Sequence, residues 1–527
     1  MNYKSTVLLL VSSWYVSESK TPKITIVLVV DQFAHHEFQK IIRYCNGGMR
    51  FLYDNGINYL NAFQAQGTPV TGAGHAALST GAYATDHGIV GNFWITPEGK
   101  KIKCDSDEKG NASPVHIMVD TLSDQLILNN SAEHPFDVCA ISLKSRAAIM
   151  MAGRLGKPFW FNKKDKGFIS SPYYGDQLPQ WLIDFNTRIN GRDFEDVTWN
   201  LLYPSTSPAY QFVKEITYQW VFLRSLIHRP LEDILFNKVL GLFQKTPAAN
   251  ELLFDCAHAY ITHTLHATPD KNIVLWLGLS SLDKVGHLFG PDSFEVIDML
   301  YQLDQQLGKF MKKVEEISDP QEILWLLTAD HGIAPILNVV HEEGYTPAQR
   351  ISLPALRNDL NAYVGKEHHI HQLFTDYKSP ALYLNEKKLA KLTTKQKNQL
   401  FIAIKNYILT NYPGIARVWT FDELQNTFCL PFSRTFFMKQ QLYPGRSGQL
   451  ILEVRPYVCI DRFKKGAGHG APYDYDMHVP LIICRSGILP AQTIVQSVYA
   501  QQIPVTLAAL LNVPRPSAST FDLLPGI

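Results

Sequence analysis

Two short segments of the sequence pair an aspartate with a histidine at a spacing that suits metal binding. Asp283 and His287 are four positions apart, so a helical turn or a tight loop would place both on one side. Asp330 and His331 are adjacent. Carboxylate oxygen and imidazole nitrogen are ligands that zinc accepts in four-coordinate sites. Together with Asp31 and one further histidine, these residues provide enough ligands for two zinc ions.

A third segment, residues 68–81, contains a candidate nucleophile. Within it, Thr71 precedes a run of small residues that can open a helix, which predicts an N-cap-like position for this threonine. The free amide donors and the positive dipole end of a helix N-terminus suit a phosphate dianion. An isolated threonine at such a position is more often a plain structural cap, so a catalytic role for Thr71 depends on the motifs around it.

Five apolar runs of strand length must position these residues. They are rich in β-branched or aromatic side chains and comprise residues 24–30, 136–143, 272–279, 323–328 and 479–484. Continuous apolarity without alternation is typical of strands that are buried on both faces. Amphipathic, helix-like stretches such as residues 293–314 lie between them. The alternation predicts an α/β fold with a central, mostly parallel sheet sandwiched by helices.

Polar residues follow four of these runs closely. They are Asp31 after the first run, Lys144 and Arg146 after the second, Asp283 and His287 after the third, and Asp330 and His331 after the fourth. One polar residue at a strand end would mean little, because loops are solvated. Ligands of open α/β sheets bind at the carboxyl ends of the strands, so four successive strands that end in this way predict one shared crevice.

The composition is that of a globular protein with a large core. The chain has 527 residues, of which 46% are hydrophobic and 12% aromatic. The 49 Lys and Arg residues nearly balance the 48 Asp and Glu residues, giving a formal charge of +1. Because there is no basic excess and no run of Lys and Arg, we expect no nucleic-acid partner. We expect a monomer.

Length alone would allow three or four domains, but the motifs are spread over most of the chain. We therefore expect one catalytic domain, residues 20–527, with insertions near residues 160–250 and 340–465 that cap the sheet. The second insertion contains a predicted strand–helix–strand at residues 381–385, 394–409 and 416–420.

The first 19 residues have the features of a signal peptide. Lys4 precedes an apolar stretch at residues 6–16, and small or polar residues follow before Lys20. This order is typical of export signals and predicts a periplasmic or secreted protein. An uncleaved anchor or an amphipathic start are the alternatives. The stretch is too short to span a bilayer, and no later stretch is long enough, so we expect no transmembrane span.

Several motifs that occur in order between residues 24 and 513 resemble those of the alkaline phosphatase superfamily. Thr71-x-x-Gly-His75, followed by residues 87–94, is similar to the active-site segment of threonine-nucleophile alkaline phosphatases. The nucleotide pyrophosphatase/phosphodiesterases share a related version. Residues 30–31, 281–287, 328–332 and 468–476 resemble the metal motifs of the same family. The resemblance implies an alkaline-phosphatase-like fold.

The resemblance also implies two Zn²⁺ per chain and a role for each matched residue. One zinc would be held by Asp283, His287 and His469, and the other by Asp31, Asp330 and His331 together with Thr71 Oγ. Thr71 would be the catalytic nucleophile and would form a covalent phospho-threonine that is then hydrolysed. Thr71 is followed by glycine and not by the arginine that accompanies the serine nucleophile of other alkaline phosphatases. We therefore expect no dedicated magnesium site.

Three further residues determine which phosphate ester is expected. The side chain of Asn92 can donate to a phosphate oxygen, and residues 142–146 resemble the segment by which the monoesterase branch adds Lys144 and Arg146 to its site. A monoester dianion has one more anionic oxygen than a diester. A guanidinium and an ammonium group bind that additional charge favourably. We therefore expect an enzyme that hydrolyses small-molecule phosphate monoesters.

Two alternatives remain. A phosphodiesterase or nucleotide pyrophosphatase would use the same two-zinc site but prefer diesters. A non-catalytic relative would bind metal or phosphorylated ligands without turnover, and it would be marked by the loss of the nucleophile or of a zinc ligand. Every matched position carries a suitable residue, which favours an enzyme.

Overall fold

The computed structural model describes residues 21–131, 135–191, 197–214, 242–463 and 465–527. The predicted signal peptide, residues 1–19, lies outside the described residues. Within the described ranges, no helix combines the length and the apolarity needed to cross a membrane.

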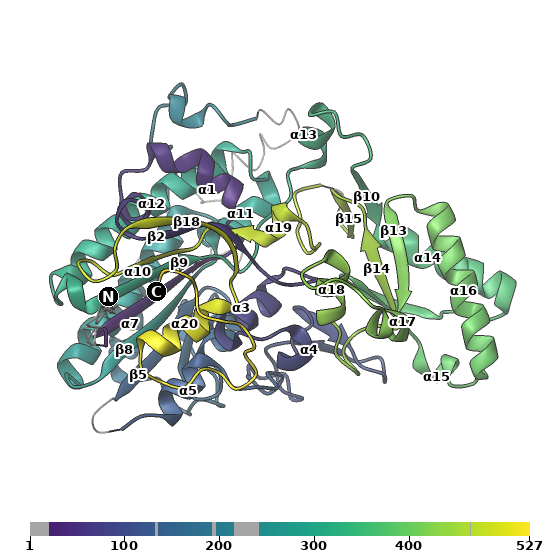
Figure 1. The fold of residues 1–527 in the computed structure, drawn as a ribbon, viewed down its shortest axis with the longest axis horizontal. Coiled ribbons are helices and arrows are strands. Elements are labelled where there is room, and N and C mark those ends of the chain that lie inside the picture. Colours follow the sequence, from purple (N-terminus) through teal and green to yellow (C-terminus); the bar gives the residue numbers. More distant parts are fainter. Residues whose placement is uncertain (1–20, 132–134, 192–196, 215–241, 464) are drawn as a thin grey trace, which may run out of the picture.

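A large central sheet forms the framework of the molecule (Figure 1). Its middle is parallel and has the order β9 (Ile323–Thr328), β1 (Ile24–Val30), β8 (Asn272–Leu279), β5 (Phe136–Ser142) and β6 (Lys157–Asn162). At one edge β7 (Gly167–Ile169) pairs antiparallel with β6. At the other edge lie β17 (Ile482–Cys484), β2 (Ile57–Phe63), β16 (His478–Val479) and β18 (Gln492–Tyr499). The predicted α/β class with a mostly parallel sheet is confirmed.

The apolar runs form the strands of the sheet, with one difference. Four of the five predicted strands match β1, β5, β8 and β9 to within one residue. The fifth, residues 479–484, was predicted as one strand but is divided into β16 and β17 around Pro480, and both pair antiparallel with β2. Proline has no N–H to donate to a strand ladder, so the run cannot continue through this residue.

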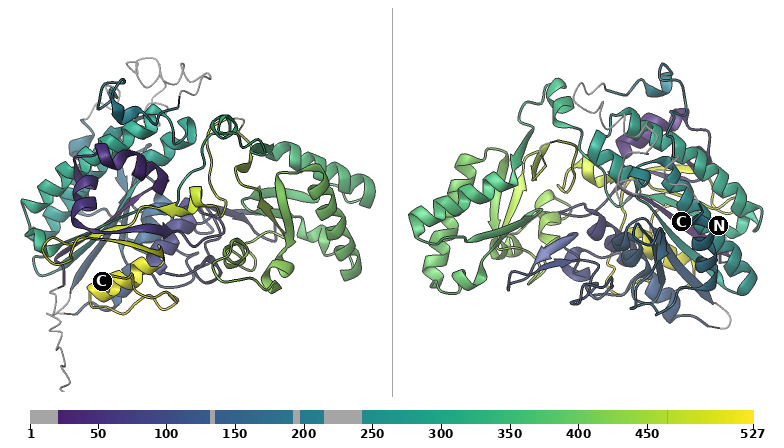
Figure 2. Two further views of the ribbon diagram at one scale, coloured as in Figure 1. Left: turned by 45° about the horizontal axis from the view of Figure 1, so that its top comes forward. Right: turned by 180° about the vertical axis from the view of Figure 1, so that it is seen from behind.

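Helices cover both faces of the central sheet (Figures 1 and 2). Alternate residues of β1 belong to different cores: Ile24, Ile26 and Leu28 to one, Val27 and Val29 to the other. The first face packs against α1 (His35–Ile41), α2 (Gly48–Asn55), α7 (Gln180–Ile189), α10 (Pro247–Ala267), α11 (Ser281–Phe289) and α12 (Phe294–Glu315). The second packs against α3 (Thr71–Thr80), α5 (Leu122–Leu128), α6 (Ser145–Ala152) and α20 (Gln502–Leu510).

A second lobe lies beside the sheet, at the right of Figure 1. It contains the pair β10 (Gln349–Ser352) and β15 (Val458–Asp461), the antiparallel sheet β11 (Phe374–Lys378), β12 (Ala381–Leu384), β14 (Leu450–Val454) and β13 (Ile415–Thr420), and the helices α14 (Leu353–His368), α15 (Glu386–Leu389) and α16 (Thr394–Asn411). The lobe has its own apolar core. The predicted strand–helix–strand corresponds to β12, α16 and β13.

The remaining elements are short. They are η1 (Ile42–Tyr44), α4 (Ala84–His87), β3 (Phe93–Ile95), β4 (Lys101–Lys103), η2 (Pro208–Tyr210), η4 (Pro320–Glu322), α13 (Leu337–Glu342), α17 (Phe421–Asn426), α18 (Arg434–Gln440) and α19 (Asp474–Met477).

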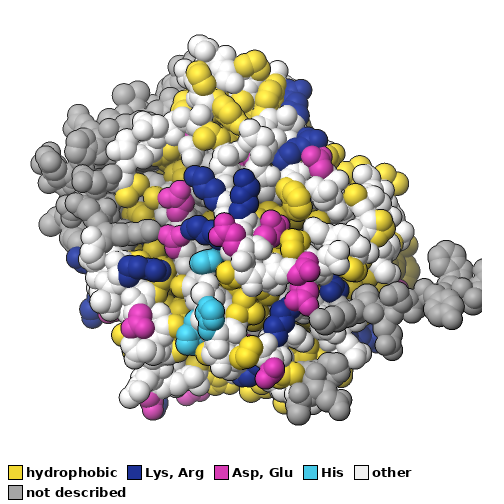
Figure 3. Space-filling view, turned by 90° about the vertical axis from the view of Figure 1, so that its left-hand side faces the viewer, with side chains coloured by type: hydrophobic (Ala, Val, Ile, Leu, Met, Phe, Trp, Pro, Cys, Tyr) yellow, Lys and Arg dark blue, Asp and Glu magenta, His cyan; other side chains and the backbone are white. Residues whose placement is uncertain are grey.

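The face at the left of Figure 1 carries basic and acidic side chains interspersed with histidines (Figure 3). The described atoms of that face therefore form no extended surface of one charge.

Candidate active site

The polar residues that follow the central strands converge at the carboxyl ends of those strands. Lys144 lies at the centre of this cluster. Its Nζ is 2.6 Å from Asp31 Oδ2 and 2.5 Å from Asp283 Oδ2. These three residues follow β1, β5 and β8, which are neighbours in the sheet. The crevice that the sequence predicted is therefore present, and it brings together side chains from distant parts of the chain.

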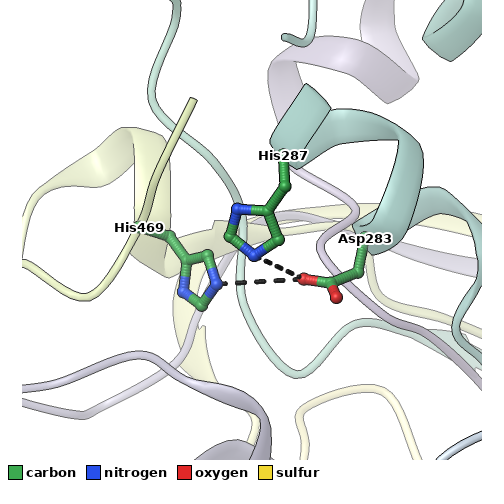
Figure 4. Close-up of side chains that lie close together, drawn as sticks. All are labelled: Asp283, His287 and His469. Atoms are coloured by element: carbon green, nitrogen blue, oxygen red, sulfur yellow. Dashed lines mark ion pairs between the residues drawn. The ribbon is translucent and has the colours of Figure 1, made fainter. Parts of the chain in front are cut away.

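Asp283, His287 and His469 form a first group of candidate metal ligands (Figure 4). One turn of α11 places His287 Nε2 3.2 Å from Asp283 Oδ1, and His469 Nε2 lies 3.8 Å from the same oxygen. The Nδ1 atoms are 3.0 Å from the Ala467 carbonyl oxygen and 2.8 Å from the Pro69 carbonyl oxygen, respectively. A ring whose Nδ1–H donates to a carbonyl presents the lone pair of Nε2 to a metal.

Asp31, Asp330 and His331 form a second group, which is fully buried. His331 Nε2 is 3.5 Å from Asp31 Oδ1 and 3.4 Å from Asp330 Oδ2, and all three side chains are 0% exposed. His331 Nδ1 lies 2.9 Å from the Gly332 carbonyl oxygen. Asp283 borders this group as well, because ligand atoms of Asp31, Asp283 and His331 lie within 4.8 Å of one another.

The donor atoms of the second group fit a cation. Asp31 Oδ1 and His331 Nε2 are buried and make no hydrogen bond within the described part of the chain, while Asp31 Oδ2 lies 2.6 Å from Lys144 Nζ and Asp330 Oδ2 lies 3.2 Å from His75 Nδ1. Buried carboxylates are costly unless a positive charge lies among them. An imidazole nitrogen with a carboxylate oxygen of Asp31 and one of Asp330 within 3.5 Å of it is a ligand set for a divalent metal ion.

The pKa values of the cluster follow from burial and charge. Burial and the neighbouring Asp330 raise the pKa of Asp31 to about 6. Burial lowers the pKa of His331 to about 4, so this imidazole is neutral. Burial alone would raise the pKa of Asp283, but the Lys144 ammonium and His287 hold it well below its usual range. A neutral imidazole and an ionised carboxylate are the forms that bind metal.

Thr71 is the first residue of α3 and is buried. The sequence predicted an N-cap-like position, whereas the cap is Val70 and Thr71 begins the helix. Thr71 Oγ1 lies 3.5 Å from Lys144 Nζ. One turn later, His75 Nδ1 lies 2.9 Å from the Thr71 carbonyl oxygen and 3.2 Å from Asp330 Oδ2. The threonine hydroxyl is thus next to the lysine, and His75 links the Thr71 backbone to Asp330 of the buried ligand group.

The small residues after Thr71 allow α3 to approach the buried ligand group. A side-chain carbon at Gly74 would lie 2.4 Å from the Asp330 carbonyl oxygen. One at Gly72 would lie 2.8 Å from Cys104 Sγ and 3.0 Å from Asn92 Oδ1. Contacts of this length are too short for any larger residue. The run of small residues therefore sets the distance between the threonine and the strand ends.

Asn92 and Lys144 contact the start of α3, and Arg146 follows Lys144 by two residues. Asn92 Oδ1 accepts a hydrogen bond of 2.7 Å from the Gly72 N–H, which leaves its amide N–H groups to other acceptors. Lys144 is the N-cap residue of α6, and Arg146 lies in the first turn of that helix. Arg146 is half-buried, its buried Nε makes no hydrogen bond to any described residue, and its charge acts on Lys144.

Gln32 is a residue of the cluster that the sequence did not single out. Its backbone N–H donates to Asp330 Oδ1 at 3.1 Å, and its Nε2 donates to Asp283 Oδ1 at 3.0 Å. It therefore links the two ligand groups. Its φ of +71° is in the left-handed region, where residues other than glycine are uncommon. A glutamine after Asp31 is an ordinary loop residue in sequence, so no signal marked it.

Asp476 fixes the loops that carry two of the histidines. Its Oδ2 accepts hydrogen bonds from the Gly470 N–H at 2.8 Å and the Ala471 N–H at 3.0 Å, next to His469. Its carbonyl oxygen accepts the Gly332 N–H at 2.7 Å, next to His331. The motif at residues 468–476 contained this aspartate, but sequence alone gave it no separate role.

The known proteins that are similar to this chain include several alkaline phosphatases. PhoV of Synechococcus elongatus is 27% identical over 96% of this chain and 93% of its own length. PafA of Elizabethkingia meningoseptica is 28% identical over 94% of this chain and 93% of its own length. The crystal structure of wild-type PafA has a TM-score of 0.85 and 26% sequence identity, and the match covers 96% of this chain and 99% of that chain.

A family model matches most of the sequence. It describes the type I phosphodiesterase / nucleotide pyrophosphatase family and matches residues 25–472. This range includes β1, α3, both ligand groups and the second lobe. The chain therefore belongs to the type I phosphodiesterase / nucleotide pyrophosphatase family.

Proposed function

We propose that the chain is a zinc-dependent phosphate monoester hydrolase, an alkaline phosphatase, with Thr71 as its nucleophile. The observation that carries this proposal is the position of Lys144. Its ammonium group lies 3.5 Å from Thr71 Oγ1 and contacts one aspartate of each ligand group. A hydroxyl, a cation and two sets of metal ligands in one buried crevice suit the transfer of a phosphoryl dianion. The alkaline phosphatases PhoV and PafA support the same activity.

We assign two zinc ions to the two ligand groups. Asp283, His287 and His469 would hold one ion, and Asp31, Asp330 and His331, with Thr71 Oγ1, would hold the other. When bound, the ions would supply positive charge at the attacking and leaving oxygens and lower the pKa of the threonine hydroxyl.

The side chains of the crevice have separate tasks in the proposed reaction. Thr71 Oγ1 loses its proton to solvent, attacks phosphorus and forms the covalent phospho-threonine, while the leaving oxygen departs with the electron pair of the broken P–O bond and takes up a proton from solvent. Lys144 and Arg146 neutralise the anionic oxygens of the phosphoryl group, and an N–H of Asn92 donates to one of them. Water then attacks phosphorus, which releases phosphate and restores the threonine hydroxyl.

The two cations also favour monoesters over diesters. A diester has one negative charge fewer and an additional substituent at the position that Lys144 and Arg146 would contact. A phosphodiesterase with the same two-zinc site is the second candidate, because the family includes phosphodiesterases.

The experiment that separates the two candidates is a comparison of kcat/KM for para-nitrophenyl phosphate and bis-para-nitrophenyl phosphate, with an EDTA control. A large monoester preference that is lost with chelator supports the phosphatase. A diester preference would assign the chain to the phosphodiesterase branch. Metal binding without turnover of either ester would indicate a non-catalytic relative.

The variant Arg146→Ala tests the role of the guanidinium in the same assay. We expect it to lower monoester hydrolysis by roughly 10–100-fold, because a charge-assisted contact to the additional anionic oxygen is lost. Diester hydrolysis should change far less. Equal losses on both esters would remove the proposed role of Arg146.

We further propose that residues 20–527 form one catalytic domain with insertions near 160–250 and 340–465, preceded by an export signal at residues 1–19. The second lobe, which has its own core, supports the position of the second insertion. N-terminal sequencing of the protein recovered from the periplasm tests the signal peptide, and an intact Met1 in the cytosol would contradict it.

A further inference from the structure

A cavity of about 810 Å³ opens beside the ligand group Asp283, His287 and His469. One wall comes from α11, which contributes Lys284 and Leu288 next to the ligands. The opposite wall comes from the second lobe and includes residues of β11, β14 and β15. The cavity therefore begins at a proposed zinc site and extends between the sheet and the second lobe.

Most charged residues of the cavity wall are already engaged. Arg350 Nη1 is 3.0 Å from Asp461 Oδ2, and its Nη2 donates to the Gly466 carbonyl oxygen at 2.6 Å. Asp476 accepts two backbone N–H groups. Asp283 belongs to the ligand group.

Lys245 and Lys284 differ from these engaged residues of the cavity wall. Both line the cavity and both are partly buried, yet neither forms an ion pair with a residue in the described ranges. Burial and the nearby charge of Lys163 lower the pKa of Lys245. Two partly desolvated ammonium groups give this part of the cavity an excess of positive charge, and an anion placed there would offset that charge.

The rest of the wall suits an organic group. Tyr457 and Tyr475 stack with ring centroids 4.8 Å apart, and Leu288 and Val458 lie on the same cavity surface. Aromatic rings and aliphatic side chains bury an apolar or aromatic body, while the lysines would hold a charged substituent of the same molecule.

We propose that this cavity binds the leaving group of the substrate and selects phosphate monoesters whose leaving group has an apolar or aromatic body and an anionic substituent. The proposal rests on the proposed function, because the leaving oxygen would lie at the zinc held by Asp283, His287 and His469. The phosphoryl group is recognised by Lys144, Arg146 and Asn92, whereas Lys245 and Lys284 recognise the other end of the molecule.

The test uses two substrates that differ in one charge. These are 4-(carboxymethyl)phenyl phosphate and its primary amide, 4-(carbamoylmethyl)phenyl phosphate, which have nearly the same size. The full chain loaded with zinc should have a kcat/KM at least about tenfold higher for the carboxylate. In Lys245→Met this preference should fall to about twofold, with the amide little changed. Lys391→Met, at an exposed position of the second lobe, is the matched control and should retain the preference.

A binding measurement makes the test independent of turnover. Calorimetry with the product 4-hydroxyphenylacetate should show a Kd that rises about tenfold in Lys245→Met, while binding of 4-hydroxyphenylacetamide stays the same. Equal kcat/KM for both phosphates in the parent protein, or a preference that survives in Lys245→Met, would overturn the proposal. If Lys245→Met loses activity on the amide as well, Lys245→Gln takes its place, and the same two outcomes apply.

The failure of the two proposals can be distinguished. If neither phosphate is hydrolysed but the carboxylate product binds in a Lys245-dependent way, the proposed function is wrong and the anionic subsite stands. If both phosphates are hydrolysed at equal rates, the proposed function stands and the subsite is wrong.

Discussion

The two ligand groups differ in how they are exposed and in where their residues come from. Asp31, Asp330 and His331 are 0% exposed and lie directly at strand ends of the sheet. In the other group, His287 keeps 43% of its side chain exposed, and His469 comes from a loop that follows the second lobe. The buried group is fixed by the core of the molecule, whereas the open group borders the cavity. We infer that a metal ion held by the buried group, Asp31, Asp330 and His331, would bind the nucleophile Thr71. A metal ion held by the open group, Asp283, His287 and His469, would bind the leaving group of the substrate.

The largest effect is expected at Thr71, beside the buried group. Thr71→Ala removes the proposed nucleophile, so the phosphoenzyme should not form and kcat should fall by at least about a thousandfold. Acid quenching with a ³²P-labelled substrate measures the phosphoenzyme, and steady-state assays measure kcat. Thr71→Ser, which keeps a hydroxyl, is the control and should form a phosphoenzyme. Substantial steady-state turnover in Thr71→Ala would exclude the assignment.

The second prediction sets one histidine of each group against the other. His469→Ala should reduce the zinc content from two ions to one and lower kcat about 100-fold or more, because a ligand of the open group is lost. His331→Ala should also lose one ion, and in addition it should lower the free energy of unfolding by about 1–3 kcal/mol, because the buried carboxylates of Asp31 and Asp330 lose the bound cation. Metal analysis and denaturant titration measure the two effects.

If both histidine variants unfold at the same denaturant concentration, the expected difference in stability between the two ligand groups is absent. That result would mean that burial does not distinguish the groups. Unchanged zinc content in His469→Ala would exclude His469 as a ligand.

A smaller effect is expected at Asp476, which is hydrogen-bonded to the loops of both groups. Asp476→Ala leaves the Gly470 and Ala471 N–H groups without their acceptor, and we expect the zinc affinity of the open group to fall by about 10–100-fold. Asp476→Asn keeps one acceptor oxygen and should restore most of the affinity. Competition with a chelator measures it. Equal affinities in Asp476→Asn and Asp476→Ala would show that the acceptor oxygen does not position His469.

The last prediction concerns folding and not catalysis, at two buried histidines to which no metal is assigned. Burial lowers the pKa of His36 and of His87 to about 3, from an ordinary value of 6.5. The unfolded chain therefore binds more protons than the folded chain between pH 6.5 and pH 3. The free energy of unfolding should fall as the pH decreases through this window, because protonation of these histidines favours the unfolded chain.

The variant His87→Asn identifies this contribution. Its Oδ1 can replace His87 Nδ1, which accepts the Ile89 N–H at 3.1 Å. Denaturant titrations between pH 6.5 and pH 4 should give a shallower pH dependence than in the parent protein. If the free energy of unfolding of His87→Asn depends on pH as steeply as in the parent protein, the loss of stability at low pH comes from the ligand groups instead.

The central strands and their polar ends were predictable because each depends on local sequence. A continuous apolar run such as residues 272–279 forms a buried strand wherever it pairs, and Asp283 then follows at its carboxyl end. The division of the fifth strand at Pro480 was not predicted, although the proline itself was visible, because the apolar run around it reads as one strand.

Contacts between distant segments could not be read from the sequence. Gln32 joins Asp283 and Asp330 only because the segments that follow β1, β8 and β9 meet above the sheet. The cavity depends on how the second lobe lies against α11, and no local pattern records that arrangement. The small residues after Thr71 were visible, but their purpose, a close approach to Asp330, appeared only in three dimensions.

The edge of the sheet has a consequence for the synthesis of the protein. β2, the second strand in sequence, pairs only with β16, β17 and β18 among the described strands, and these form after residue 477. His469 also lies late in the chain. A growing polypeptide therefore carries an unpaired strand until it is almost complete, and such edges promote aggregation. Contacts between remote segments also slow folding. The last tenth of the chain thus closes the sheet. On the proposed assignment of His469 as a metal ligand, a nascent chain would also remain inactive until it nears its full length.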